Sequence, residues 1–119
     1  MADSPSTILD DVKKELNIGP DVHEFDLDIR SHINGAFFAL YQIGVGPSRP
    51  FRIDNSTIWT DYETSIPYDV ILDYLHLKVA LVFDPPSSNS VVDAYKDRIS
   101  ELEFRMNVEV DDGGGNVTG

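Results

Sequence analysis

Two sets of aspartate and histidine residues are the side chains in this sequence most suited to chemistry. Asp28 and His32 lie four positions apart, and Asp69, Asp73 and His76 follow one another at intervals of four and three. On helices, each set would lie along one face, and two helices that each carry a carboxylate and a histidine outline a dinuclear metal site. Such a site would make the protein a metal-dependent enzyme.

The details of the spacing do not favour a metal site. Dinuclear metal bundles use a Glu-x-x-His motif on each of two helices and further glutamates that face the same core. The second set offers only aspartate at this spacing, and the first set contains no matching triplet. The simpler interpretation is that the second set forms the solvated edge of an apolar helix. We therefore expect no metal and no cofactor.

Signatures of other catalytic sites are missing from the sequence. There is no cysteine, which excludes disulfides, thiolate zinc sites and a cysteine nucleophile. Gly44-Val45-Gly46 follows a predicted helix, not a strand, and lacks the lysine of a phosphate-binding loop. No serine lies in a nucleophile-elbow pattern. The sequence therefore predicts a protein that is not an enzyme.

Charge and hydropathy exclude two classes of partner. Twenty-one acidic residues against nine basic ones give a net charge of -12, which repels a phosphate backbone, so we expect no direct DNA binding. The longest apolar stretch is interrupted by Asp73, His76 and Lys78, and the N-terminus lacks the features of a secretion signal. We expect a soluble protein without a membrane partner, made inside the cell.

Helices are the elements that would position these residues. Apolar side chains recur every three or four residues in four segments, near residues 6–18, 21–43, 65–83 and 88–106. The predicted fold class is all-α, a small bundle of about four helices with a long ordered loop between the second and third helices and an extended C-terminal arm. A single helical domain is expected over residues 1–110, with a flexible tail over residues 111–119.

Residues that favour helix ends mark the first two helices. Ser4-Pro5 or Ser6 can cap the first helix, and Gly19-Pro20 would end it. Asp21 and Glu24 resemble a capping box that opens the second helix.

The third helix is apolar around nearly its whole circumference. Such a helix must be buried on most sides, and a bundle this small cannot enclose it entirely, so we expect part of it to lie in a subunit interface. After it, Asp84 is followed by Pro85 and Pro86. Because each proline fixes its own φ and disfavours helix in the preceding residue, the chain must turn there.

The last helix carries an apolar seam and then changes its pattern. Apolar residues from Val92 to Met106 are spaced by 3, 4, 3 and 4, as in packed helix pairs. Beyond Met106, Val108 and Val110 alternate with polar residues, which predicts a short extended segment.

Residues 47–64 form the least periodic part of the chain. We predict a long ordered loop with a short helix that Ser56 caps, and this loop holds Trp59, the one tryptophan. Long structureless loops are uncommon in compact domains. Trp59 therefore either plugs the end of the bundle or contacts a partner.

Four motifs follow one another along the chain: FDLDIRSHINGAFFALYQIGVGP (25–47), STIWTDYE (56–63), YLHLKVALVFDPPSSN (74–89) and ISELEFRMNVEVDD (99–112). Their succession resembles that of the head-to-tail connector, or neck adaptor, proteins of tailed bacteriophages, over residues 22–112. The resemblance implies a helical subunit that forms a ring, typically of about twelve copies, beneath the portal protein. Such a ring extends the DNA channel and receives the next neck protein.

The same resemblance implies a structural virion protein that is assembled in the host bacterial cytoplasm and has no enzymatic activity. Double-stranded DNA would pass through the ring without specific binding. Three groups of residues receive roles. The predicted subunit interface contains Trp59, Tyr74, Leu77 and Phe83. The predicted channel-lining carboxylates, which would repel phosphates, are Asp54, Asp61 and Glu63. The predicted portal-docking arm contains Met106, Val108 and Val110.

An alternative interpretation belongs to another class of protein. A free-standing acidic helical module could bind and regulate a basic partner through its charged faces. A discrete complex of low order with a basic protein would distinguish it from a ring on a portal.

Overall fold

The structure, a computed structural model, describes residues 6–113, and its regular elements there are helices. They are α1 (Ile8–Glu15), α2 (Asp26–Gln42), α3 (Tyr68–Phe83) and α4 (Asn89–Gly113), with a short 3₁₀ turn, η1 (Trp59–Asp61), between α2 and α3. In this part of the chain, extended pairing is limited to an isolated bridge between Thr7 and Ile58. The predicted all-α class and the bundle of four helices are confirmed.

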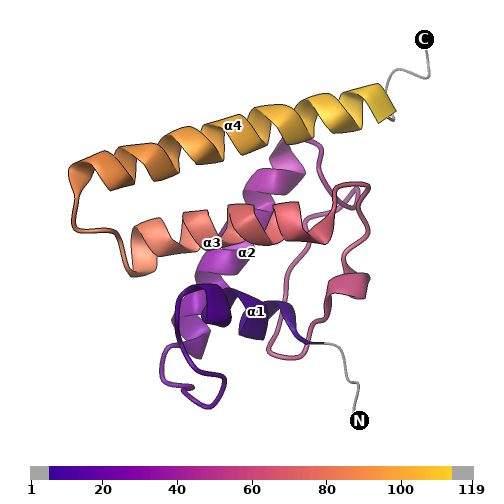
Figure 1. The fold of residues 1–119 in the computed structure, drawn as a ribbon. Coiled ribbons are helices and arrows are strands. Elements are labelled where there is room, and N and C mark those ends of the chain that lie inside the picture. The colour runs from indigo at the N-terminus through magenta and orange to yellow at the C-terminus, as the bar shows by residue number, and fades with distance from the viewer. Residues whose placement is uncertain (1–5, 114–119) are drawn as a thin grey trace.

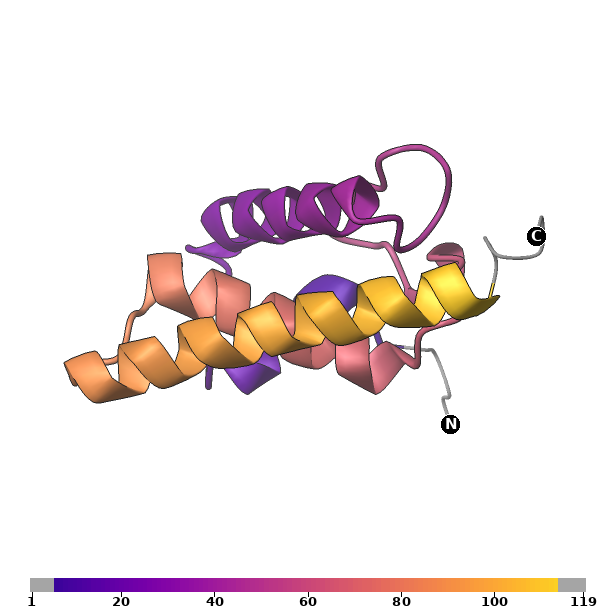
Figure 2. The ribbon, with the colours of Figure 1, turned by 90° about the horizontal axis from the view of Figure 1, so that it is seen from above.

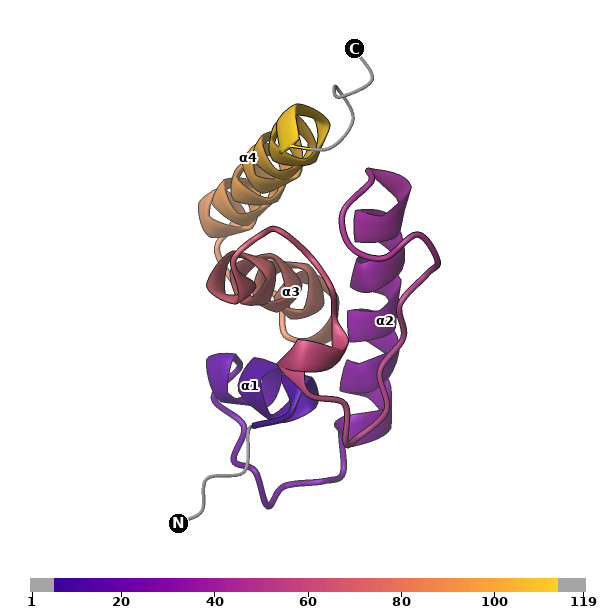
Figure 3. The same ribbon diagram turned by 90° about the vertical axis from the view of Figure 1, so that its right-hand side faces the viewer.

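Helix α3 lies at the centre of the fold and packs against the other three helices. Figure 1 shows α4 running antiparallel alongside α3, while α2 crosses α3. Viewed from above, α4 extends beyond both ends of α3 (Figure 2). Figure 3 shows α3 between α4 on one side and α2 on the other, with α1 below it. The free faces of α2 and α4 therefore look in opposite directions.

Burial of α3 follows from its central position. Ile71, Tyr74, Leu75 and Val79 are 0% exposed, whereas Val82, in its last turn, is 61% exposed. The prediction that this helix is buried on most sides is confirmed for its middle. Its C-terminal end remains open.

The first helix ends earlier than the sequence predicted. The hydroxyl of Thr7 caps α1 by accepting a 3.0 Å hydrogen bond from the Asp10 amide, whereas Ser4-Pro5 lies outside the described residues. At the other end, Asn17 adopts a φ of 63°, a conformation that asparagine tolerates better than most residues and that ends helices. The predicted end at Gly19-Pro20 was therefore wrong by about one turn.

The second helix begins later than predicted. The amides of Val22 and Asp26 donate to the carbonyls of Gly19 and His23, forming turns where the capping box of Asp21 and Glu24 was predicted to open a helix. Helix α2 then starts at Asp26. The predicted start at Asp21 was wrong because these local turns use the backbone groups that a helix would need.

Helix α4 corrects the predicted extended arm. It continues without a break through Val108 and Val110 to Gly113, and the Asn107 side-chain amide donates to the Ile43 carbonyl at 2.8 Å. Met106 and Val110 are four residues apart, so they satisfy a helical pattern as well as an alternating one. Contact with the end of α2 favours the helix. Residue 111, where the tail was predicted to start, lies inside α4.

Candidate interaction surfaces

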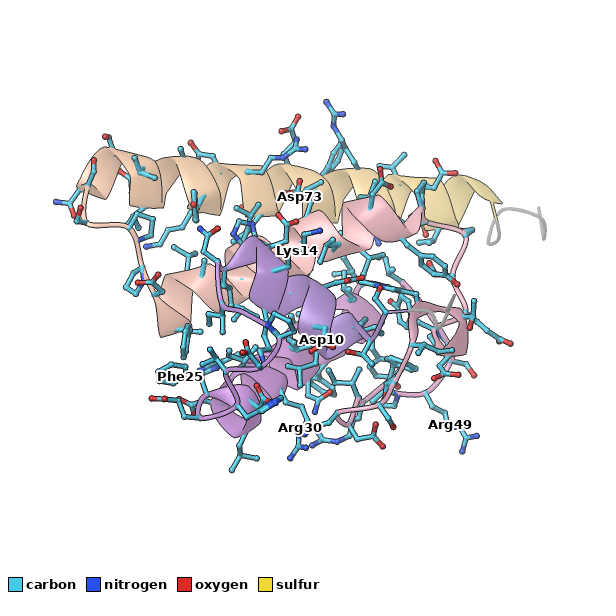
Figure 4. The ribbon with its side chains drawn as sticks, turned by 60° about the horizontal axis from the view of Figure 1, so that its bottom comes forward. Asp10, Lys14, Phe25, Arg30, Arg49 and Asp73 are labelled. Carbon is cyan, nitrogen blue, oxygen red and sulfur yellow. The ribbon has the colours of Figure 1, made fainter. Side chains whose placement is uncertain are left out.

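The two aspartate and histidine sets are not brought together as a metal site. Among residues 6–113, no group of three or more histidine, aspartate or glutamate side chains is placed to hold an ion. Asp73 instead pairs with Arg98 of α4 at 3.2 Å, near α4 in Figure 4. The His76 ring lies beside Tyr95 of α4. The second set therefore joins α3 to α4 at the solvated edge of the pair.

The long loop between α2 and α3 is held firmly against α2. The Asn34 side chain, 6% exposed, accepts a hydrogen bond from the Ile53 amide at 2.7 Å and donates to the Ile53 carbonyl at 3.3 Å. Phe51 and Tyr62 of the loop lie with ring centroids 5.0 and 4.8 Å from Phe37 of α2. Burial raises the pKa of the Tyr62 phenol well above its ordinary value. The loop is thus part of the hydrophobic core.

Gly46 is the position at which this loop comes nearest to the Tyr62 ring. Its φ is +94°, and a Cβ built there would lie 2.6 Å from the Tyr62 hydroxyl oxygen and 2.9 Å from two ring carbons. Both the backbone conformation and the space therefore require glycine.

We expect Gly46→Ala to lower the free energy of unfolding by about 2–3 kcal/mol, because backbone strain adds to overpacking against a buried ring. Urea denaturation followed by circular dichroism measures this loss. Gly44→Ala is the matched control, since Gly44 also has a positive φ of 88° but an added Cβ meets only Val110, at 3.7 Å. Equal losses in the two variants would show that the contact with Tyr62 is irrelevant.

Trp59 fastens the loop to α1. Its indole nitrogen donates to the Asp11 carboxylate at 2.6 Å, and its ring lies 5.6 Å from that of Tyr68. Nearby, the Ile8 amide donates to the Thr57 carbonyl at 2.9 Å. Trp59 is half-buried. Trp59 thus packs against α1 as a plug at the end of the bundle would, and its exposed part stays open to a partner.

Two of the three predicted channel-lining carboxylates shape the loop itself. Asp54 accepts hydrogen bonds of 2.8–3.0 Å from Ser56 and Thr57, and these bonds, led by the one from the Ser56 amide, lower the pKa of Asp54. Asp61 accepts from the Ile58 amide at 3.1 Å. Asp54, Asp61 and Glu63 are all exposed. All three belong to the loop between α2 and α3, and no hydrogen bond of the Glu63 side chain is found among the described residues.

A buried lysine is a functional group that the sequence interpretation missed. Lys13 is 0% exposed, and its amine donates to the Val22 carbonyl at 2.7 Å and lies 2.8 Å from an Asp26 carboxylate oxygen. His23 lies 2.9 Å from the other carboxylate oxygen. Burial alone would raise the pKa of Asp26, but the hydrogen bonds and charges of Lys13 and His23 outweigh it, so that pKa is lowered. Lys13 follows Leu9 by four residues on the inner face of α1, a position that could have revealed it.

The residues predicted for a subunit interface divide into two pairs. Tyr74 is 0% and Leu77 is 6% exposed, and the Tyr74 hydroxyl donates to Glu103 of α4 at 2.7 Å. These two residues join α3 to its own neighbours and do not form part of the subunit's surface. Phe83 is half-buried at the open end of α3, where its ring meets that of Phe25 edge-to-face at 5.4 Å. Phe83 and Trp59 remain at the edge of the surface.

The residues predicted for the portal-docking arm also lie in different environments. Met106 is 2% exposed and belongs to the core, whereas Val108 is 39% exposed. Val110 is half-buried and lies near Gly44. Phe104, one turn before Val108, is 69% exposed. Near the C-terminal end of α4, the open apolar stripe therefore consists of Phe104 and Val108.

The sequence of these helices and of the loop matches the model of a known protein family. A sequence model described as phage connector protein matches residues 8–113, a span that includes all four helices and the anchored loop. The chain belongs to the phage connector family. The resemblance in the sequence is thereby confirmed. No curated protein and no solved structure matches the chain.

Membership of this family gives the connector its general role. The family consists of structural virion proteins and is not known for catalysis, so the connector is a virion component that interacts with other virion proteins. Within the described residues, no helix combines the length and the apolar character needed to cross a membrane. The surfaces described above are therefore candidates for contacts with other proteins of the virion.

Proposed function

We propose that the connector forms a closed ring, of about twelve copies, beneath the portal protein of a tailed phage, where it extends the DNA channel and receives the next neck protein. Family membership supports this proposal. In the same proposal, subunits assemble in the host cytoplasm and enter the virion neck. DNA passes through the ring without being specifically bound.

The distribution of exposed apolar side chains is the observation that carries the proposal. A closed ring needs two different apolar surfaces on each subunit, because each copy contacts one neighbour on either side. Large apolar side chains more than a third exposed occur in three parts of the subunit. They lie on α2 and just before it (Val22, Phe25, Leu27 and Phe38), at the two ends of α3 (Tyr68 and Val82) and on α4 (Val91, Phe104 and Val108).

In the proposed ring, the exposed loop carboxylates of Asp54, Asp61 and Glu63 face the channel. Their negative charge repels the phosphates of the DNA, so the DNA is free to slide through the ring. The C-terminal end of α4, at Val110, would contact the portal. A ring reconstruction in which these carboxylates lie on the outside would contradict the first assignment.

Mixing the purified connector with its portal protein and imaging the product by electron microscopy tests the proposed function. We expect rings stacked coaxially on the portal. Particles in which the portal remains bare would overturn the proposed function. A small complex of fixed low order between the connector and a basic protein would favour the alternative of an acidic binding module.

The corner between α3 and α4 yields a prediction about ring closure. Helix α3 ends at Phe83, and the Asp84 amide still donates to the Ala80 carbonyl at 2.9 Å before the two prolines set the turn. Replacing Pro85 and Pro86 together by glycine should leave a folded subunit but produce open or irregular rings, since a small angular error in each subunit repeats around the circle. Circular dichroism checks the fold, and the fraction of closed rings in micrographs checks assembly. An unchanged fraction of closed rings would contradict this role of the corner.

A further inference from the structure

A shallow groove runs along the outer face of α2, on the side opposite α4. Its lining comes from one face of α2 and from residues 50–52 of the loop. Phe38, 47% exposed, and the half-buried Phe51 give it an apolar wall, and Arg52 stands at its rim. The groove is open to solvent and empty of side chains from its own subunit.

Gly35 is the floor of this groove and has no role inside the subunit. A Cβ built at Gly35 meets no atom within 4 Å, in contrast to the crowded Gly46. Glycine in the interior of a helix is destabilising relative to alanine. Since neither the backbone nor the packing of the subunit requires glycine here, close approach of another molecule would account for it.

The groove lies in the one basic region of an acidic chain. Residues 29–53 contain Arg30, Arg49 and Arg52 and no aspartate or glutamate, so their net charge is +3. Figure 4 shows Arg30 and Arg49 extending from the α2 side of the molecule, away from α4. Within the described residues, none of the three arginines takes part in an ion pair. A partner that fills this groove should therefore be apolar at its centre and acidic around it.

The last turns of α4 have the complementary character. Residues 99–111 contain four carboxylates and one arginine, a net charge of -3, and they include the exposed stripe of Phe104 and Val108. Glu109 and Asp111 make no ion pair among the described residues. Phe104 and Val108 are exposed, and the lining of the α2 groove contains no residue of α4 from the same subunit, so both surfaces are open to another molecule.

We propose that the α4 stripe of one connector subunit docks in the α2 groove of a second copy, head to tail. Phe104 fills the groove over Gly35, beside Phe38, and Glu109 faces Arg52. This inference rests on the ring of the proposed function and identifies the contact that would build it. Since groove and stripe are different surfaces, each bound copy still offers one of them to the next subunit.

Site-specific cross-linking without portal tests this contact, and the absence of native cysteine gives it a clean background. One variant carries Ser31→Cys at the groove, and the other carries Val108→Cys on α4. We expect a short bis-maleimide reagent to give covalent dimers in an equal mixture of the two and few dimers with either alone. The proposal would be overturned if one variant alone gave as many covalent dimers as the mixture. It would also be overturned if the mixture gave no more dimers than the separate variants.

Blocking and rescue variants test the named residues. Gly35→Trp, added to the groove variant, should abolish the mixed dimer without lowering the melting temperature, because the space beside Gly35 is open. Phe104→Ala in the α4 variant should weaken association about 30-fold, as for an aromatic residue at the centre of an interface. Arg52→Glu in the groove variant should lower the dimer yield, and Glu109→Arg in its α4 partner should restore it. A yield unaffected by Gly35→Trp, or a charge reversal without rescue, would contradict the assigned contact.

The outcome is separable from that of the proposed function. Portal binding is measured by imaging, whereas cross-linking requires only the connector. Mixed dimers without portal attachment would retain the head-to-tail contact and reject the ring beneath the portal. Portal rings in which the two cysteines never cross-link would retain the function and reject this contact.

Discussion

Replacing Lys13 by methionine should lower the free energy of unfolding of the connector by about 3–5 kcal/mol, the usual result of removing one partner of a buried ion pair. Methionine keeps much of the aliphatic packing but leaves Asp26, 9% exposed, with a buried charge and without its main partner. The Val22 carbonyl also loses its 2.7 Å hydrogen bond. The loss corresponds to a fall in melting temperature of roughly 10–20 °C for a domain of this size.

Lys14 provides the matched control. It is the next residue of α1 but is exposed, as Figure 4 shows, so Lys14→Met should change stability by less than about 0.5 kcal/mol. Replacing both partners, with Lys13→Met and Asp26→Leu, should recover much of the loss, since no buried charge then remains. Urea denaturation of wild type, of the single variants Lys13→Met and Asp26→Leu and of the double variant measures the coupling between Lys13 and Asp26. A Lys13→Met protein as stable as Lys14→Met would contradict the importance of the pair.

The pair of Lys13 and Asp26 also makes the stability of the connector depend on pH, with lower stability in acid. The pKa of Asp26 is lower in the folded protein than in the unfolded chain, so between the two values the unfolded chain binds more protons. The stabilisation is therefore complete above the unfolded pKa, about 3.9, and is lost as the pH falls below it. Asp26→Asn should flatten the stability curve below about pH 4. An identical acid slope in wild type and Asp26→Asn would exclude Asp26 as its source.

Local sequence patterns predicted the existence of the helices better than their ends. The spacing of apolar residues was sufficient for all four helices because each buries one broad face. The ends depended on competing local bonds: Asn17 ended α1 before Gly19-Pro20, and turns delayed α2. Toward the C-terminus, the spacing of Met106, Val108 and Val110 was consistent with both a helical and an alternating, extended pattern. Contact between Asn107 and the end of α2, which is distant in sequence, decided between them.

The surfaces for partners were harder to predict than the fold. Apolar character alone placed Tyr74 and Leu77 in an interface, but both are buried inside the subunit, and Tyr74 bonds to Glu103 of α4. The packing of the whole subunit decides which side of an apolar helix remains exposed. A local sequence pattern does not carry this information. By contrast, the lack of acidic residues over residues 29–53 is visible in the sequence. Its meaning became clear only when the structure placed Arg52 beside an empty groove.

Neighbouring phenylalanines of α2 allow the core and the proposed contact to be separated. Phe37 is 1% exposed and holds Phe51 and Tyr62 of the loop, whereas Phe38 is 47% exposed beside the groove. Phe37→Ala should lower the free energy of unfolding by about 3–5 kcal/mol, because it leaves a cavity where the loop joins the core. Urea denaturation followed by both circular dichroism and the fluorescence of Trp59, the one tryptophan, measures the loss.

Phe38→Ala should behave in the opposite way. Its stability should stay within about 1 kcal/mol of wild type, since the side chain is half in solvent, but its yield of mixed dimers should fall because one wall of the groove is removed. Phe37→Ala, tested at a temperature where it remains folded, should keep most of that yield. If both variants lost stability equally, the loop would not depend on Phe37 in particular. If both kept the full dimer yield, the α2 groove would not be the surface on which a second subunit docks.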